Sequence, residues 1–305
     1  MKTPAEFAQV LLDELWAGYR ARVPYVGVYE RLVRGARTAF VNDHVAFRTF
    51  AGQGPAGGIA SVARVFEALG FVAEACYAFP DKKLSAVHLR HRDPALPKAF
   101  VSELRTWELP PPARRVVQRA LKLARPALSD EDLAGLARPA ALSAPARARL
   151  LRRAVAHFSR PWPAPAKADV LALDRESQYA AWTLLHGRTV NHFTASVDSH
   201  GPGPLSDIEK TVAALRAAGV PMKGEIEGKR GSKLRQSATA AAEYPAEIRD
   251  RGRRARLPWT YAYFELAERG FVKDPETGAR KRFEGFLGGQ ASQLFEMTKR
   301  AGARR

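Results

Sequence analysis

Two histidine-bearing stretches, 41–50 and 189–197, carry residue types that could bind a metal ion. Both are rich in β-branched and aromatic residues, which favours strands, and both place Asn or Asp directly before the histidine. In the first stretch, the period of two puts His44 and Arg48 on one face. In the second, the same alternation surrounds His192. The alternative is that each stretch is an amphipathic strand whose polar face lies in water.

A late strand offers a third ligand. Glu265 lies in the aromatic stretch 259–266, where a buried carboxylate is costly without a cation. The neutral imidazoles of His44 and His192 and one carboxylate would leave about three open positions on an octahedral ion, which suits Fe²⁺ with a chelating substrate and dioxygen. Zinc more often has a closed or four-coordinate set. Glu268 is the competing carboxylate, but in a strand it faces the opposite side.

Three further residues are candidates for substrate binding. Arg48 lies four residues after His44, about 13 Å along a strand. An arginine in a cavity wall can bind a carboxylate through two hydrogen bonds, so we expect Arg48 to hold the far end of a short diacid. The alternative is an ion pair with Glu103. Gln236 and Ser237, on a later predicted strand, are expected to line the cavity as hydrogen-bond donors.

The other histidines and the cysteine are expected to be structural. His88 and His91 are predicted to be surface residues or neighbours of the site rather than ligands. The rest lie in helical or loop contexts: His157, His186 and His200. Cys76 is the only cysteine, which excludes an internal disulfide and a cysteine-based metal site, and its apolar surroundings predict a core position.

Two similar runs of elements would position these residues. The first is predicted to contain a strand at 41–50, a helix at 59–69, and strands at 71–78, 84–91 and 98–104. The second contains a strand at 189–197, a helix at 206–218, and strands at 222–227, 233–239 and 259–266. The sequence therefore predicts two βαβββ modules as a degenerate repeat. If they pair around one concave sheet, their first strands bring His44 and His192 together.

The predicted fold class is α+β, in one compact catalytic domain with three segments. Residues 1–108 hold an N-terminal helix and the first module, 109–185 a helical insert, and 186–305 the second module with a C-terminal tail. The N-terminal helix follows from apolar residues at three- and four-residue spacing between Phe7 and Tyr19. In the insert, helical periods occupy 116–123 and 146–158, and Ser129 marks a helix start.

Composition allows a globular protein with a sizeable core, since the 305 residues are 46% hydrophobic and 26% charged. The net charge of +18 raises the alternative of a basic nucleic-acid-binding module. However, the basic residues are spread along the chain, so we expect no specific nucleic-acid partner. No signal-type or membrane-length apolar segment is present, which predicts a cytoplasmic protein that does not contact a membrane. No phosphate loop, dinucleotide motif or serine-nucleophile motif is found.

Three strings resemble a bacterial and plant family: Asn42-Asp43-His44-Val-Ala-Phe-Arg48-Thr, Val-Asn191-His192-Phe-Thr and Tyr263-Phe-Glu265-Leu-Ala-Glu-Arg-Gly270. The family is that of 2-oxoadipate dioxygenase/decarboxylase, also called 2-hydroxyglutarate synthase, which is related to the vicinal-oxygen-chelate enzymes. The closing segment, Gly285-Phe286 and Gln290 to Thr298, is also similar to that family. The resemblance covers most of the chain outside the helical insert.

The resemblance implies that His44, His192 and Glu265 hold Fe²⁺ and that Arg48 binds a carboxylate of the substrate. It implies oxidative decarboxylation without an external co-substrate, in which a 2-oxo dicarboxylate chelates the iron beside dioxygen and 2-oxoadipate becomes 2-hydroxyglutarate and carbon dioxide. The alternative within the same superfamily is a metalloenzyme for a different 2-oxo acid. The chain resembles a short form of the family, since longer members carry extra segments around the cavity.

Overall fold

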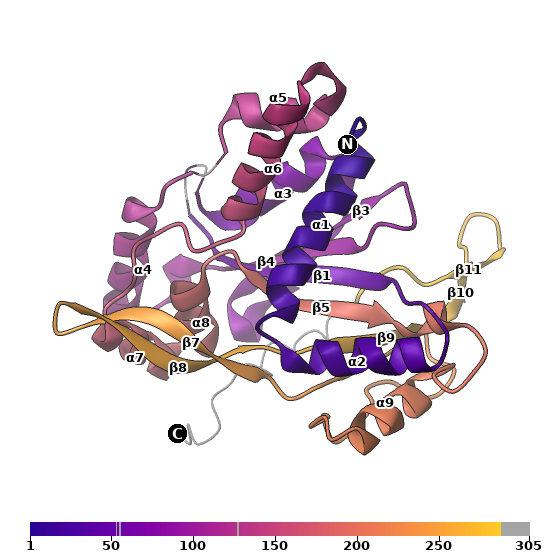
Figure 1. Cartoon of the computed structure of the whole chain (residues 1–305). Coiled ribbons are helices and arrows are strands. Elements are labelled where there is room, and N and C mark those ends of the chain that lie inside the picture. The colour runs from indigo at the N-terminus through magenta and orange to yellow at the C-terminus, as the bar shows by residue number, and fades with distance from the viewer. Residues whose placement is uncertain (53, 55, 127, 288–305) are drawn as a thin grey trace.

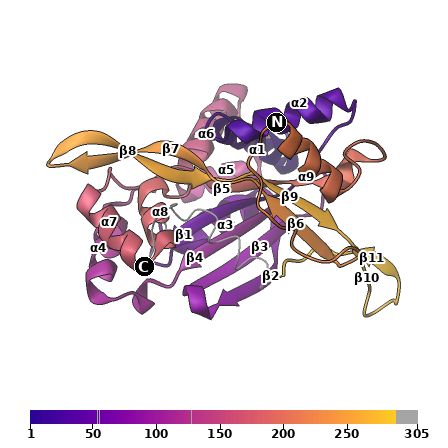
Figure 2. The same ribbon diagram turned by 90° about the horizontal axis from the view of Figure 1, so that it is seen from below.

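The fold is described from a computed structural model that covers residues 1–305 except 53, 55, 127 and 288–305. A seven-stranded sheet of order β2-β3-β4-β1-β5-β9-β6 curls through the molecule (Figures 1 and 2). Its strands are β1 (Asn42–Phe50), β2 (Phe71–Phe79), β3 (Leu84–His91), β4 (Lys98–Leu104), β5 (Val190–Ser196), β6 (Leu234–Ala238) and β9 (Glu265–Arg269).

The sheet is built from two modules, as the sequence predicts. The first runs β1, α3 (Gly58–Ala68), β2, β3, β4, and the second runs β5, α9 (Ile208–Ala217), β6, β9. The two modules join at the centre, where β1 and β5 pair antiparallel. The helix of each module is followed by a glycine with positive φ, Gly70 at 94° and Gly219 at 80°. Glycine tolerates this conformation without a Cβ clash, so both helices end at the predicted place.

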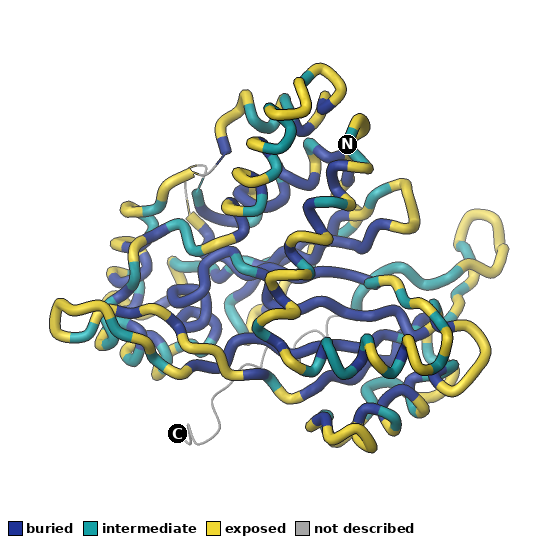
Figure 3. Tube along the Cα trace, viewed as in Figure 1, coloured by how far each residue is buried: buried dark blue, intermediate teal, exposed yellow. Residues whose placement is uncertain are grey.

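One face of the sheet is covered by helices from three parts of the chain. They are α1 (Pro4–Arg20), α2 (Pro24–Gly35), α3, α5 (Asp130–Ala137), α6 (Ala144–His157) and α9. Val45 and Phe47 of β1 point into this core, and both are buried. Figure 3 shows the central strands β1 and β5 as buried, beneath more exposed helices. Consequently the opposite side chains of β1, which include His44 and Arg48, face the other side of the sheet.

The segment between the modules contributes to both faces. The helices α5 and α6 lie on the face just described, whereas α4 (Pro111–Leu123), α7 (Lys167–Glu176) and α8 (Gln178–His186) pack on the other face near Ala46 and Phe50. Ser129 begins α5 with a capping box, in which its hydroxyl and the carboxylate of Asp132 satisfy each other's backbone amides. The helices α4, α7 and α8 therefore fill one end of the His44 face.

The second module differs from the prediction in two strands. The stretch 222–227 makes only two isolated bridges, Met222 with Thr239 and Glu227 with Gln236. The predicted strand 259–266 is split between β8 (Arg253–Ala262), which pairs with β7 (Ala242–Asp250) in a separate hairpin, and β9. The break lies at Phe264, whose backbone amide and carbonyl both bond Thr239. At this point the chain leaves the hairpin and enters the main sheet.

Cys76 is exposed, so its predicted core position is wrong. It lies on β2, one of the two edge strands of the sheet, which is largely exposed along its length. A second small hairpin, β10 (Phe271–Lys273) and β11 (Arg280–Arg282), follows β9. Among the described residues, no helix is both long and apolar enough to cross a membrane.

Candidate metal centre

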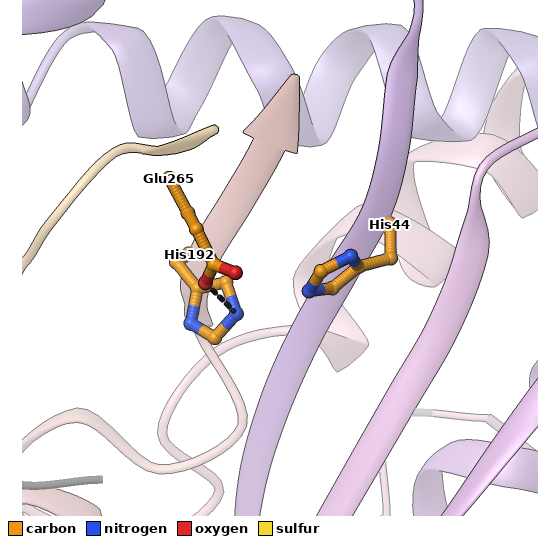
Figure 4. A group of neighbouring side chains, drawn as sticks. All are labelled: His44, His192 and Glu265. Atoms are coloured by element: carbon orange, nitrogen blue, oxygen red, sulfur yellow. Dashed lines mark ion pairs between the residues drawn. The ribbon is translucent and has the colours of Figure 1, made fainter. Parts of the chain in front are cut away.

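The structure brings His44, His192 and Glu265 together on the concave face. The histidines come from the central strands β1 and β5, and Glu265 is the first residue of β9, opposite Thr194 of β5. All three are buried, with Glu265 wholly inaccessible. One ligand atom of each lies within 4.8 Å of the others (Figure 4). This spacing brings the three donors within reach of one metal ion.

Both histidines follow a β-bulge. Along the β1–β5 pair, the register shifts between Asn42 and His44 on one strand and between Val190 and His192 on the other. The extra residues are therefore Asp43 and Asn191, each directly before its histidine. A bulge turns the side chains of the residues around it, and bulges are frequent beside active sites. The two modules thus present their histidines through the same local distortion.

The bulged residues hold the two imidazoles. The Nδ1 of His44 lies 2.8 Å from Asp43 Oδ1, and the Nδ1 of His192 lies 2.9 Å from Asn191 Oδ1. With Nδ1–H donating to these oxygens, each Nε2 carries the lone pair that can bind a metal, and the Nε2 of His44 lies 3.0 Å from the hydroxyl oxygen of Thr194. Burial lowers the pKa of both imidazoles, which favours the neutral form that binds metals.

The surroundings of Glu265 favour a bound cation. Its Oε1 accepts a hydrogen bond from Gln236 Nε2, whereas its Oε2 has no hydrogen-bond partner among the described residues. That Oε2 lies 3.4 Å from the Nε2 of His192, so two atoms with lone pairs face each other. Burial and the nearby carboxylates of Glu227 and Asp43 raise the pKa of Glu265 well above its usual range. A metal ion between these atoms would relieve the cost of the buried carboxylate, so the residues fit a metal.

Glu268 faces the other side of the sheet, as expected. It accepts hydrogen bonds from the backbone amide of Ile208 and from Arg235 Nη1 at 2.9 Å each. It therefore holds the start of α9 and does not compete for the metal position.

Arg48 lies in the wall of the same cavity. Only 1% of its surface is exposed, and its guanidinium lies over the rings of Tyr179 and Trp182 of α8, at 5.0 and 5.1 Å. Glu103, the alternative partner, faces the opposite side of the sheet, where its carboxylate accepts a hydrogen bond from Ile59 at the start of α3. The helical segment between the modules thus orients Arg48 toward the cavity.

The cavity is mostly apolar, with a few polar groups. Its lining residues are His44, Ala46, Phe47, Arg48, Phe100, Ser102, Asn191, His192, Gln236, Tyr263, Phe286 and Leu287. Ser237, the neighbour of Gln236 on β6, is buried but is not among these lining residues. The ring of Tyr263 stacks on His192 at 4.7 Å, and the ring of Phe286 meets His44 edge-on at 4.8 Å.

The remaining histidines lie outside the group of three. His88 is buried rather than at the surface; it bonds Tyr77 and its ring lies 5.1 Å from Phe286, so it neighbours the cavity. The imidazole of His91 accepts a hydrogen bond from the amide of Asp93. The three others are buried in structural positions: His157, His186 and His200.

Sequence reasoning missed the roles of Asp43, Asn191 and Phe286. For the first two a signal was present, since an Asx residue precedes the histidine in both strands. For Phe286 the signal is the family resemblance of Gly285-Phe286, which does not give its place, because that depends on how the chain after β11 returns to the sheet. The resembling stretch from Gln290 to Thr298 lies outside the described residues.

A family model for 2-oxoadipate dioxygenase/decarboxylase matches residues 12–301, nearly the whole chain. The chain belongs to the 2-oxoadipate dioxygenase/decarboxylase family. Its similar relatives include the chloroplastic/amyloplastic 2-oxoadipate dioxygenase/decarboxylase of Oryza sativa, 29% identical over 96% of this chain and 79% of the relative. The chloroplastic enzyme of Arabidopsis thaliana is 28% identical over 97% and 79%.

Solved structures agree with this family assignment. The hydroxyglutarate synthase of Oryza sativa, in complex with 2-oxoadipate, superposes with a TM-score of 0.77 at 26% identity, covering 97% of this chain and 93% of that one. A putative glyoxalase superfamily protein from Ralstonia eutropha gives a TM-score of 0.80 at 25% identity, covering 93% and 87%. The fold of this chain is therefore the glyoxalase-like, vicinal-oxygen-chelate arrangement of paired modules.

Proposed function

We propose that this protein is an iron(II)-dependent enzyme that converts 2-oxoadipate and dioxygen to 2-hydroxyglutarate and carbon dioxide. The observation that carries the proposal is the convergence of His44, His192 and Glu265, with the unbonded Glu265 Oε2 facing the Nε2 of His192. Family membership supports the reaction, and the rice relative with bound 2-oxoadipate supports the substrate.

The donor set supports iron as the metal. Two neutral imidazoles and one carboxylate on one face of an ion leave positions open for a chelating 2-oxo acid and dioxygen. Bound Fe²⁺ would supply the redox chemistry that dioxygen requires. The protein's own part is to hold the three donors: Asp43 and Asn191 orient the imidazoles, and Gln236 fixes the carboxylate through its Oε1.

Arg48 is proposed to bind the carboxylate at the far end of the substrate. It lies on the face of β1 that carries His44, about 13 Å further along the strand, and both side chains reach into the cavity between them. The rings of Tyr179 and Trp182 beside the guanidinium restrict its movement, which favours two parallel hydrogen bonds to a carboxylate. We propose that the aromatic wall of Phe100, Tyr263 and Phe286 excludes water from the reacting carbon atoms.

The reaction balances without another co-substrate. Carbon dioxide carries away two oxygen atoms of the 2-oxo acid, and both atoms of dioxygen must then appear in 2-hydroxyglutarate, one in the hydroxyl and one in the new carboxylate. The test is dioxygen uptake by the iron-loaded protein with 2-oxoadipate, using ¹⁸O₂ and mass analysis of the product. We expect one dioxygen consumed per 2-hydroxyglutarate and two labelled atoms in it. Turnover without dioxygen uptake would instead identify a different reaction at the same centre.

A further inference from the structure

Arg269, the last residue of β9, is a buried arginine next to the proposed metal centre. Its Nε lies 2.5 Å from Asp43 Oδ2, and its Nη2 lies 2.8 Å from Asp43 Oδ1. Asp43 in turn accepts the hydrogen bond from the Nδ1 of His44. Arg269 therefore fixes the carboxylate that fixes a metal-binding imidazole.

The same guanidinium holds the segment 283–287. Its Nη1 donates to the backbone carbonyls of Phe283 and Gly285, at 3.1 and 2.8 Å. Lys98 bridges the same two parts, since its Nζ lies 3.7 Å from Asp43 Oδ2 and 2.5 Å from Glu284 Oε2. Two buried cations are thus shared between Asp43 and this segment.

Phe286, in the same segment, contacts both His44 and Arg269. Its ring centroid lies 4.8 Å from that of His44 and 5.4 Å from the guanidinium carbon of Arg269, and it lines the cavity. The segment that Arg269 holds therefore lays an aromatic ring against the imidazole that Arg269 orients. Displacement of the segment would remove one contact of His44 and open one wall of the cavity.

We infer that Arg269 is a positioning residue that couples metal binding to closure of the cavity by segment 283–287. The inference rests on the metal centre of the proposed function. Coupling between two such events is reciprocal: if the closed segment favours the metal, then the metal favours the closed segment by the same factor. This gives a readout that does not depend on turnover.

The first experiment uses the unmodified protein with Mn²⁺ as the probe. Hydrogen exchange of the amides of Phe283 and Phe286, which bond the Gly270 carbonyl and the Tyr77 hydroxyl, reports opening of the segment. We expect Mn²⁺ to slow exchange in the peptide that covers 283–287. Exchange that Mn²⁺ leaves unchanged, in a protein that binds Mn²⁺, would overturn the inference without any substitution.

The second experiment compares Arg269→Lys with Arg235→Lys. Arg235 on β6 is also buried and paired with two carboxylates, Glu209 and Glu268, but on the other face of the sheet. Lysine keeps the charge, but it cannot make the bidentate ion pair with Asp43 and also donate to the backbone carbonyls of the segment. We expect Arg269→Lys to weaken Mn²⁺ binding about tenfold to hundredfold, measured from the signal of free Mn²⁺ by electron paramagnetic resonance.

The control should keep both Mn²⁺ affinity and the metal-dependent protection of 283–287. If Arg269→Lys lowers the melting temperature but binds Mn²⁺ as tightly as the unmodified protein, Arg269 is only structural and the inference fails. A protein that binds Mn²⁺ and protects the segment, yet does not turn over 2-oxoadipate with iron, would refute the proposed function and leave this inference standing.

Discussion

At the scale of single residues, His44 and His192 differ in what holds them. The Asp43 carboxylate behind His44 is balanced by Arg269 and Lys98, whereas the Asn191 amide behind His192 is neutral. These contacts surround the Asp43 carboxylate with cations and hold its pKa well below the usual range, despite burial. An imidazole whose Nδ1–H donates to a carboxylate is a better electron donor, so His44 should be the stronger of the two proposed ligands.

Replacing His44 should therefore abolish the centre. We expect His44→Ala to lose stoichiometric Fe²⁺ binding and all 2-oxoadipate turnover, because two donors remain and the buried Glu265 loses its shared cation. Metal content after anaerobic loading and dioxygen uptake measure the two effects. His91→Ala, which changes a half-buried imidazole outside the site, should retain both. Full activity in His44→Ala would refute the metal assignment.

Arg48 should control which substrates bind rather than the chemistry. We expect Arg48→Met, which keeps much of the packing on Tyr179 and Trp182, to raise KM for 2-oxoadipate about tenfold to hundredfold, since hydrogen bonds to a charged group contribute about 1.5–3 kcal/mol. For 2-oxohexanoate, which lacks the far carboxylate, KM should change little. Equal losses for the diacid and the monoacid would show that Arg48 does not bind the far carboxylate.

At the scale of elements, alternation in the sequence was sufficient to predict which side chains share a face. His44 with Arg48, and Glu265 opposed to Glu268, lie as period two requires, because one face of each strand packs under helices and the register cannot slip. The prediction that Ser237 lines the cavity beside Gln236 differs from the structure, in which Gln236 lines it and Ser237 does not. The bulges at Asp43 and Asn191 could not be predicted, because they are defined only by the pairing of β1 with β5.

The second module shows a different limit of predicting strands from the sequence. The apolar run 259–266 gives one continuous strand signal, but its first half belongs to the β7–β8 hairpin and its end to the main sheet. The break depends on Thr239, distant in sequence, which bonds both the amide and the carbonyl of Phe264. A local pattern contains no information about such a contact. The apolar run alone therefore does not predict the β7–β8 hairpin.

Glu103 tests whether the face of the sheet opposite the cavity contributes to stability and not to catalysis. It is the neighbour on β4 of Ser102, which lines the cavity. Its own carboxylate accepts a hydrogen bond from the backbone amide of Ile59 and so holds the start of α3 on the opposite face. We expect Glu103→Ala to lower the free energy of unfolding by about 1 kcal/mol, as for loss of a helix cap, with kcat/KM for 2-oxoadipate unchanged. Urea denaturation and dioxygen uptake measure this. A large loss of kcat/KM at unchanged stability would place Glu103 in the site instead.

At the scale of the whole molecule, buried neutral histidines link stability to pH. Burial lowers the pKa of His157 to about 3, helped by the nearby Arg188, and that of His186 also to about 3. In the unfolded chain both imidazoles titrate near 6.5. Between these values the unfolded state binds protons that the folded state does not, so stability falls as pH is lowered from about 6.5 toward 3.

The contribution of His157 to this pH dependence of the unfolding free energy can be measured separately. Each such histidine contributes up to about 1.4 kcal/mol per pH unit within the window, so in the metal-free protein His157→Gln should reduce the slope of the unfolding free energy by about that amount between pH 5.5 and 4.5. Urea denaturation at several pH values measures it. Because the Nε2 of His157 bonds the carbonyl of Ser61, a glutamine amide can replace the donor and keep the local fold. His91→Gln, at a half-buried position, should alter the slope much less. If His157→Gln kept the original slope, His157 would already be protonated in the folded protein, and the arginine-rich surroundings of α6 would have to tolerate one more buried positive charge.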